Sequence, residues 1–232
     1  MPAPADPKER LIVALDYPNS KAALTLIAQL EGLVSFYKVG LELFAAGGTD
    51  LVEALLAQGK KVFLDLKFLD IQETVRRATK QVARLGVQFL TVHESGRVVA
   101  AAVRGAEGSN TKILAVTLLT DMDAEEMRAM GYAGSTEDLV LSRARRALAA
   151  GAHGVIASGQ EARQIRALSQ EAIIVTPGIR PAGTAAGDQL RTATPAEAIA
   201  AGADYIVVGR PIRDAKDPYA AAQQIINEIQ LA

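Results

Sequence analysis

Eight short, mostly apolar runs recur along this chain of 232 residues, and longer Ala- and Leu-rich stretches of helical period separate them. Such alternation is typical of βα units arranged around a parallel sheet. The expected strands are 11–16, 36–41, 62–67, 89–94, 113–119, 154–158, 173–179 and 205–210. Eight βα units in a chain of this length predict an α/β fold, a TIM (β/α)8 barrel, as a single domain over residues 1–232. Residues 1–9, polar and proline-rich, are expected to form a flexible N-terminal tail.

Local signals mark the ends of the expected helices. Glycine most easily adopts the left-handed conformation that often ends a helix, and glycines follow helical stretches at positions 32, 59, 86, 151 and 202. Thr194, Pro195 and Glu197 have the pattern of a capping box with proline at the first helical position. Asp217 before Pro218 repeats this start signal.

Charge and composition exclude several function classes. The formal net charge of -1 offers no electrostatic footprint for nucleic acid or an anionic membrane. The absence of cysteine excludes disulfides, a thiolate nucleophile and a thiolate metal site. His93 and His153 fall on different βα units without a second ligand at metal-binding spacing. With no secretory signal or membrane span at the N-terminus, we expect a cytoplasmic protein.

Polar residues gather where the expected strands end. These residues are Asp16, Lys38, Asp65, Lys67, His93, Glu94, Thr117, Thr120 and Arg210. Active sites of TIM barrels lie at this C-terminal mouth, built from strand ends and the loops that follow them. The sequence therefore predicts a polar site at the mouth of the barrel.

The run FLDLKFLDIQETV (63–75) carries the densest charge. Side chains two apart on a strand share a face, so Asp65 and Lys67 point the same way, and Asp70 follows just past the strand end. An ion pair at the barrel rim with no catalytic role is the alternative interpretation. Asp16 and Lys38 at the two preceding strand ends favour a functional cluster, because charges gathered at one mouth are costly to desolvate.

A second signal follows the last two strands. Loops in this position frequently bind phosphate in TIM barrels, and here they read TPGIRPAGTAAGDQ (176–189) and VVGRPI (207–212). Gly209 allows backbone amides to approach an anion, and Arg210 offers a forked, permanently charged donor. The alternatives are an ordinary surface loop and a solvated arginine. The flexible composition of the first loop also suits a lid that closes over a ligand.

Together these motifs resemble the bacterial type of orotidine 5'-phosphate decarboxylase, from IVALD (12–16) to VVGRPI (207–212). The most specific matches are FLDLKFLDI, LAVTLLT, VTPGIRPAGTAAGDQ and DYIVVGRPI. The resemblance implies conversion of orotidine 5'-monophosphate to uridine 5'-monophosphate, the last step of de novo pyrimidine nucleotide synthesis, with no metal or organic cofactor. It implies an alternating array of Lys38, Asp65, Lys67 and Asp70, in which Lys67 protonates C6 of the pyrimidine.

The resemblance also implies a homodimer, in which Asp70 enters the partner's site. Asp16 and Lys38 would bind the ribose hydroxyls, Thr120 would lie beside the pyrimidine, and Thr74 belongs to the implied binding set. At the phosphate end the implied residues are Arg180, Gln189, Gly209 and Arg210.

Several positions depart from the family pattern. They are Leu69, Gln72 and Glu73 around Asp70, Glu94 and Arg97 after the fourth strand, and Asp121 near the expected pyrimidine position. Added carboxylates near an anionic substrate should weaken its binding unless they point away from it.

Two other functions remain open. One is a magnesium-dependent sugar-phosphate decarboxylase or lyase on a related barrel, which shares the Asp-x-Lys-x-x-Asp strand. The other is a barrel that binds nucleotide monophosphates without catalysis. Outside the expected site, Tyr132 and Tyr205 are interpreted as packing residues, and the arginine-rich stretch 142–154 as a helix with a solvated basic face.

Overall fold

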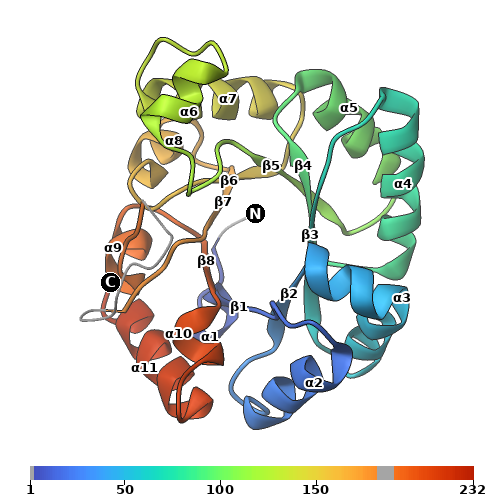
Figure 1. Ribbon diagram of the computed structural model, residues 1–232, viewed down its shortest axis with the longest axis vertical. Helices are drawn as coiled ribbons and strands as arrows, with labels where there is room; N and C mark the ends of the chain where they lie inside the picture. Colours follow the sequence, from blue (N-terminus) through green and yellow to red (C-terminus); the bar gives the residue numbers. More distant parts are fainter. Residues whose placement is uncertain (1–2, 182–190) are drawn as a thin grey trace.

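The computed structural model describes residues 3–181 and 191–232, and the predicted barrel is confirmed within them. Eight parallel strands close into a barrel in the order β1 to β8, with helices outside the strand ring (Figure 1). The strands are β1 Leu11–Ala14, β2 Phe36–Gly40, β3 Lys61–Phe68, β4 Phe89–His93, β5 Lys112–Val116, β6 Gly154–Ile156, β7 Ile173–Thr176 and β8 Tyr205–Val208. Seven end one to three residues before the predicted end, and β3 runs one residue further.

The helices surround the strands, and the predicted end signals are present where the sequence placed them. The helices are α1 Pro7–Arg10, α2 Ser20–Gln29, α3 Leu41–Ala57, α4 Gln72–Leu85, α5 Gly96–Gly105, α6 Ala124–Ala129, α7 Thr136–Ala149, α8 Ala162–Leu168, α9 Pro195–Ala200, α10 Arg210–Arg213 and α11 Pro218–Gln230. All five predicted glycines have positive φ, from 73° to 104°. The capping box of Thr194 and Glu197 is present at α9, and Asp217 caps α11. No helix of the described segments combines the length and apolarity needed to cross a bilayer.

Two apolar layers hold the barrel together. The larger layer lies between the strands and the helices, and the smaller one fills the interior. Inside, Phe36, Phe89 and Tyr205 meet with ring centroids 5.2 to 5.9 Å apart. Each begins its strand, so aromatic rings fill the N-terminal half of the barrel. Tyr205 is thus confirmed as a packing residue.

Residues two further along the same inward faces are more polar. Lys38 lies two positions after Phe36 on β2, and Asp65 and Lys67 lie two and four positions after Phe63 on β3. Because inward-pointing residues recur every second position, one face of a strand supplies both the apolar base and the polar mouth.

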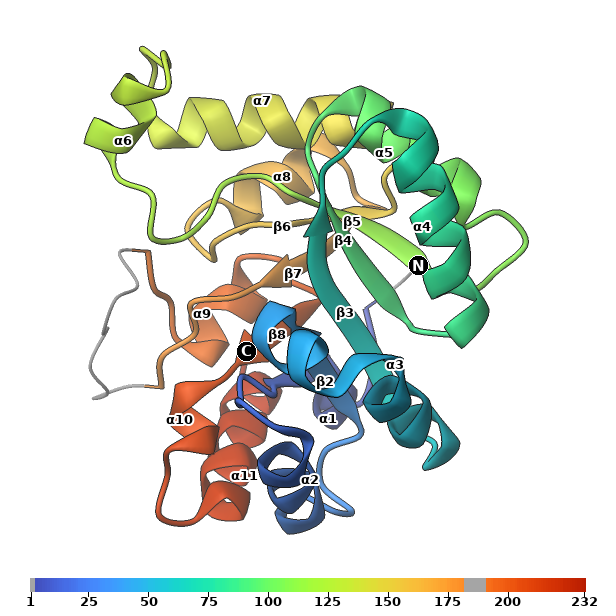
Figure 2. The ribbon, with the colours of Figure 1, turned by 45° about the vertical axis from the view of Figure 1, so that its right-hand side comes forward.

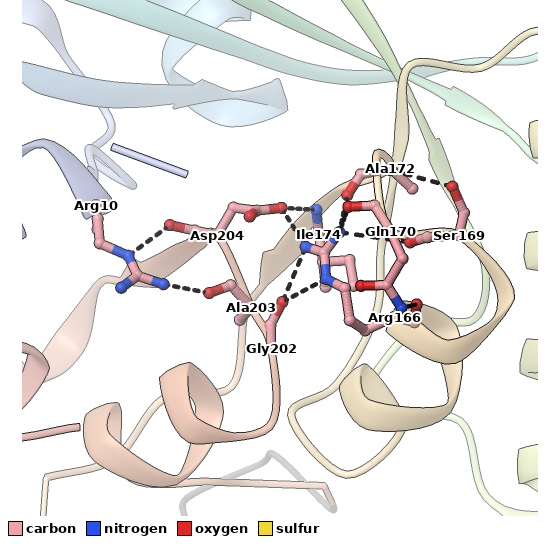
Figure 3. Close-up of polar contacts among 9 residues, drawn as sticks. All are labelled: Arg10, Arg166, Ser169, Gln170, Ala172, Ile174, Gly202, Ala203 and Asp204. Atoms are coloured by element: carbon pink, nitrogen blue, oxygen red, sulfur yellow. Dashed lines mark hydrogen bonds and ion pairs between the residues drawn. The ribbon is translucent and has the colours of Figure 1, made fainter. Parts of the chain in front are cut away.

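The N-terminal end of the barrel is tied by buried charge (Figure 3). Arg166 on α8 donates to Asp204 Oδ2 at 2.7 Å and to the backbone oxygens of Gly202 and Ala172. Arg10 donates to the backbone oxygens of Asp204 and Ala203. Residues 7–10 therefore form α1 and its link to β8, although residues 1–9 were expected to be a flexible tail.

Candidate active site

The end of β3 has an unusual backbone. Lys67 lies in the left-handed region at φ 49°, which costs a non-glycine residue about 1–2 kcal/mol. The pairing of β3 with β4 shifts register between Leu64 and Phe68, and Lys67 N donates to Thr91 Oγ1 at 3.0 Å. Such strained residues concentrate at functional sites, where the surrounding structure holds them in place. The bend directs Lys67 into the mouth of the barrel.

Four charged side chains from three strand ends form one alternating chain. Lys38 Nζ lies 2.9 Å from Asp16 Oδ1 and 3.7 Å from Asp65 Oδ2. Lys67 Nζ lies 3.0 Å from Asp65 Oδ1, which also accepts a hydrogen bond from Thr91 Oγ1 at 2.8 Å. Asp65 therefore lies at the centre of the chain, between two ammonium groups.

The environment of Asp65 favours its ionised form. Burial alone would raise the pKa of Asp65, because only 14% of its side chain is exposed. The ammonium groups of Lys38 and Lys67 and the Thr91 hydroxyl outweigh this effect, so the pKa of the carboxyl lies below its ordinary value. Asp65 thus keeps its negative charge at neutral pH and attracts both lysines.

Gly40, which sequence analysis missed, leaves room for this chain of charged side chains. A Cβ atom at Gly40 would lie 3.0 Å from Lys38 Nζ and 3.3 Å from Asp16 Oδ1. The side chain of any other residue would therefore crowd the first ion pair. In the sequence Gly40 is one glycine among 19, and no local pattern distinguishes it.

The charged chain faces a cavity with two lobes. One lobe, about 440 Å³, is lined by Asp16, Lys38, Asp65, Pro177, Gly178, Arg180, Gly209, Arg210 and Arg213, among others. The other, about 380 Å³, is mostly apolar and is lined by Lys67, Phe63, Val116, Leu118, Leu119, Thr120, Asp121 and Ile156, together with Lys38, Asp65, Pro177 and Val207. Lys38 and Asp65 line both lobes, so the centre of the charged chain lies where the two lobes meet.

Three arginines line the first lobe, of which sequence analysis identified Arg180 and Arg210. The third, Arg213, donates to the backbone oxygen of Asp16 at 2.8 Å and pairs with Asp214. Forked guanidinium donors beside a glycine suit a phosphate or carboxylate. The second lobe, mainly apolar with charge along one side, suits a flat polar ring.

The cavity of this chain does not contain every predicted site residue. Asp70 is exposed beyond β3, and its Oδ1 accepts the backbone N–H of Ile71 at 2.6 Å. Thr74 lies with Ile71 in a separate groove along α4. The charges of the 63–75 run therefore do not all converge within one chain. Gln189 lies outside the described residues.

Two departures from the family pattern point away from the cavity. Glu73 forms a two-point ion pair with Arg76 on α4. Burial would raise the pKa of Glu94, but His93 and Arg143 lower it below the ordinary value. Glu94 pairs with Arg143 Nε at 3.1 Å, so the negative charge of its carboxylate is balanced by the guanidinium. Asp121, in contrast, lines the second lobe.

The prediction for the arginine-rich helix was wrong at one position. Arg143 on α7 is buried, and its guanidinium donates to Thr117 O and Tyr132 Oη, both at 2.8 Å. Its charge also lies over the Tyr132 ring, 5.0 Å from the centroid. Tyr132 therefore packs, as predicted, but against a cation. The spacing of arginines along a helix could not show which one turns inward.

The described residues hold no group of three or more His, Asp or Glu side chains that could bind a metal ion. His93 lies 3.6 Å from Glu94, and His153 Nδ1 accepts the backbone N–H of Ile113 at the other end of the barrel. His93 therefore lies beside a carboxylate, and His153 has a local hydrogen-bonding role. The prediction that no metal takes part remains a prediction.

A closed βα barrel with an alternating carboxylate and ammonium chain at its mouth, beside an arginine-lined lobe, defines a TIM-barrel enzyme for a small anionic substrate. The family model described as "Orotidine 5'-phosphate decarboxylase / HUMPS family" matches residues 9–225. The chain belongs to this family, and the predicted resemblance is confirmed.

Individual relatives agree with the family assignment. The orotidine 5'-phosphate decarboxylase of Nitrobacter winogradskyi is 54% identical over 223 residues, which cover 96% of this chain and 93% of the relative. That of Cereibacter sphaeroides is 54% identical over 225 residues, covering 95% and 97%. The crystal structure of orotidine 5'-phosphate decarboxylase from Lactobacillus acidophilus superposes with a TM-score of 0.85 at 38% identity, covering 95% of this chain and 99% of that one.

Proposed function

We propose that this protein decarboxylates orotidine 5'-monophosphate to uridine 5'-monophosphate in the cytoplasm, without a metal ion, and that Lys67 donates the proton to C6. The observation that carries the proposal is the chain Asp16–Lys38–Asp65–Lys67, with its centre where the two lobes of the cavity meet. The names of the relatives support the same substrate.

The chemistry demands a fixed positive charge. When the bond from C6 to the carboxylate breaks, carbon dioxide leaves and the electron pair stays on C6, in the plane of the ring. The ring π-system cannot delocalise this pair, so stabilisation must be electrostatic. An ammonium group held 3.0 Å from Asp65 is preorganised for this task. Transfer of one Lys67 proton to C6 then completes the product.

The two lobes suggest the orientation of the substrate. The phosphate would lie among Arg180, Gly209 and Arg210. The ribose hydroxyls would meet Asp16 and Lys38, and the pyrimidine would lie in the second lobe near Thr120. The phosphate would bind far from the reacting carbon. Because one site holds both ends of the substrate, the energy of phosphate binding would help to lower the activation barrier of decarboxylation.

We further propose a homodimer in which Asp70 completes the partner's site. Leu69 and Ile71, on either side of Asp70, are 63% and 74% exposed. Large apolar side chains beside an exposed carboxylate favour an edge that a second copy covers. Thr74 and its groove on α4 continue this edge.

A spectrophotometric assay with orotidine 5'-monophosphate in excess chelator tests the reaction. We expect turnover in the parent protein and a loss of at least about 1,000-fold in Lys67→Ala, since both charge stabilisation and the proton donor disappear. Lys61→Ala is the matched control. Lys61 begins the same strand, at the end opposite to the cavity, and its only ion pair among the described residues is an exposed one with Glu9 at 3.4 Å. Its turnover should equal that of the parent.

The alternatives give different results in the same assay. No turnover of orotidine 5'-monophosphate, together with turnover of a sugar phosphate that chelator abolishes and magnesium restores, would indicate the metal-dependent sugar-phosphate lyases. Tight binding of uridine 5'-monophosphate without turnover would indicate a non-catalytic barrel.

Mixing two inactive variants tests the composite site. If Asp70 acts across the dimer, exchanged subunits of Lys67→Ala and Asp70→Asn should regain about a quarter of the parent activity, since half of the dimers then contain one intact site of two. No recovery after proven subunit exchange would place Asp70 in its own chain's site, and an Asp70→Asn variant that is fully active by itself would place Asp70 outside catalysis.

A further inference from the structure

The segment that leaves β5 is held by its backbone. Three consecutive carbonyl groups, those of Thr117, Leu118 and Leu119, accept hydrogen bonds from two arginines. Arg143 donates to Thr117 O at 2.8 Å. Arg191 donates to Leu119 O at 2.8 Å and to Leu118 O at 3.4 Å. The chain has left the sheet here, so these arginines replace part of the hydrogen bonding that a strand would provide.

This segment forms one wall of the second lobe, which is lined by Leu118, Leu119, Thr120 and Asp121. Figure 2 shows it running from β5 out to α6. The side chains of these residues can take fixed positions against a ligand only if their backbone is fixed. The position of the wall therefore depends on the two arginines.

Each arginine is itself anchored by a carboxylate. Arg143 pairs with Glu94 at 3.1 Å, at the end of β4. Arg191 pairs with Glu161 at 2.8 Å, next to the start of α8, and these two side chains are only 9% and 5% exposed. Within the described residues Arg191 Nε and Glu161 Oε2 have no hydrogen-bond partner. Desolvation offsets much of the attraction within a buried ion pair, which favours a role other than holding the fold.

We infer that Arg143 and Arg191 are positioning residues that fix the wall of the second lobe against the base of the substrate. The inference rests on the proposed function, because it assigns the second lobe to the pyrimidine. It also gives Glu94 a function: this departure from the family pattern is the counter-ion of one of the two arginines.

The same contact chemistry occurs where no ligand is expected. Arg166 donates to the carbonyl groups of Ala172 and Gly202 and pairs with Asp204, at the N-terminal end of the barrel. Arg166→Lys is therefore a matched control for the loss of a partly buried, carbonyl-binding arginine. Lysine keeps the charge but loses the fork that reaches a carbonyl and a carboxylate together.

The experiment compares two probes, uridine 5'-monophosphate and ribose 5-phosphate, which differ by the base. Their dissociation constants are measured by calorimetry for the parent, Arg143→Lys, Arg191→Lys and Arg166→Lys. We expect each of the first two variants to weaken the nucleotide about tenfold, a change of about 1.4 kcal/mol, and ribose 5-phosphate less than about twofold. Arg166→Lys should lower the melting temperature and leave both constants unchanged.

Milder variants keep the test decisive if a lysine variant does not fold. Glu94→Gln and Glu161→Gln keep the shape of each pair but neutralise the anchor, and they should show the same selective loss on a smaller scale. Equal weakening of both probes, or no weakening of either, would overturn the inference while leaving the proposed function intact. A parent protein that binds ribose 5-phosphate but not the nucleotide would remove the pyrimidine assignment, and both proposals with it.

Discussion

Asp65 is the residue whose charge most strongly connects the site to the stability of the barrel. Replacing it by asparagine keeps the size of the side chain and an acceptor for Thr91 but removes the negative charge between Lys38 and Lys67. At 3.0 Å and an effective dielectric of about 20, the Coulomb attraction to Lys67 is about 5.5 kcal/mol. Removing one partner of a buried pair costs about 3–5 kcal/mol net.

The structure favours the lower end of that range. Lys67 is 28% exposed, so water can partly replace the carboxylate, and Lys38 keeps Asp16 at 2.9 Å. We therefore expect Asp65→Asn to lower the free energy of unfolding by about 3 kcal/mol at pH 7. In a chain of this size that loss corresponds to a fall of about 6–12 °C in melting temperature.

The pH dependence gives an independent check on this mechanism. The pKa of Asp65 is lower in the folded protein than its ordinary value, so its contribution to stability is complete above the unfolded value of about 3.9. The contribution is lost as the pH falls below that value and the carboxyl takes up a proton. The difference between parent and variant should therefore be constant from pH 8 to about pH 5 and shrink below about pH 4.

Urea unfolding of both proteins across this range measures the difference directly. Other acidic groups titrate equally in the two proteins and cancel. A variant as stable as the parent at pH 7 would refute the ion-pair account. A difference of the same size at pH 7 and pH 3 would show that the effect is one of packing and not of charge.

Two further predictions concern the base of the barrel and the packing beneath the site. Asp204→Ala removes the carboxylate that accepts hydrogen bonds from both Arg166 and the Ile174 N–H. The melting temperature should therefore fall by about 6–12 °C, with kcat/KM unchanged at 25 °C. Scanning fluorimetry measures the melting temperature and the decarboxylase assay measures kcat/KM; an unchanged melting temperature would contradict the prediction. Gly40→Ala places a Cβ atom 3.0 Å from Lys38 Nζ. In the decarboxylase assay kcat/KM should therefore fall about tenfold, which corresponds to an activation barrier higher by about 1.4 kcal/mol. Kinetics equal to those of the parent would show that the Lys38–Asp16 ion pair tolerates the crowding.

The barrel could be predicted because its signals are local and repeated. Each strand is a short apolar run bounded by glycine or a capping residue, and those features do not depend on the rest of the fold. Errors in the fold fell in the expected N-terminal tail, where Pro7–Arg10 form α1, and at strand ends. At Thr117, for example, a predicted strand residue instead begins the segment held by Arg143. The sequence does not show where a strand stops pairing with its neighbours.

The site could be predicted only where neighbouring strands bring its residues together. Asp65 and Lys67 share a face two positions apart, and Asp16 and Lys38 occupy the equivalent ends of the two preceding strands. Arg143 and Arg191 escaped prediction because their partners lie 26 and 72 residues away for the shortest carbonyl contacts. In the sequence, each is one more charged residue on or near a helix.

The buried charges of this barrel differ in how much of their hydrogen-bonding capacity the protein itself uses. Arg166 donates to a carboxylate and several backbone carbonyls far from any substrate, so nothing remains for a ligand. Lys67 has three N–H donors and, among the described contacts, uses its ammonium group only for Asp65, while the side chain lines the cavity. An ammonium that is fixed by one carboxylate and still has protons to give is suited to meet a carbanion. This difference in remaining donors, and not burial or charge alone, separates Lys67, which we assign to catalysis, from Arg166, which holds the fold.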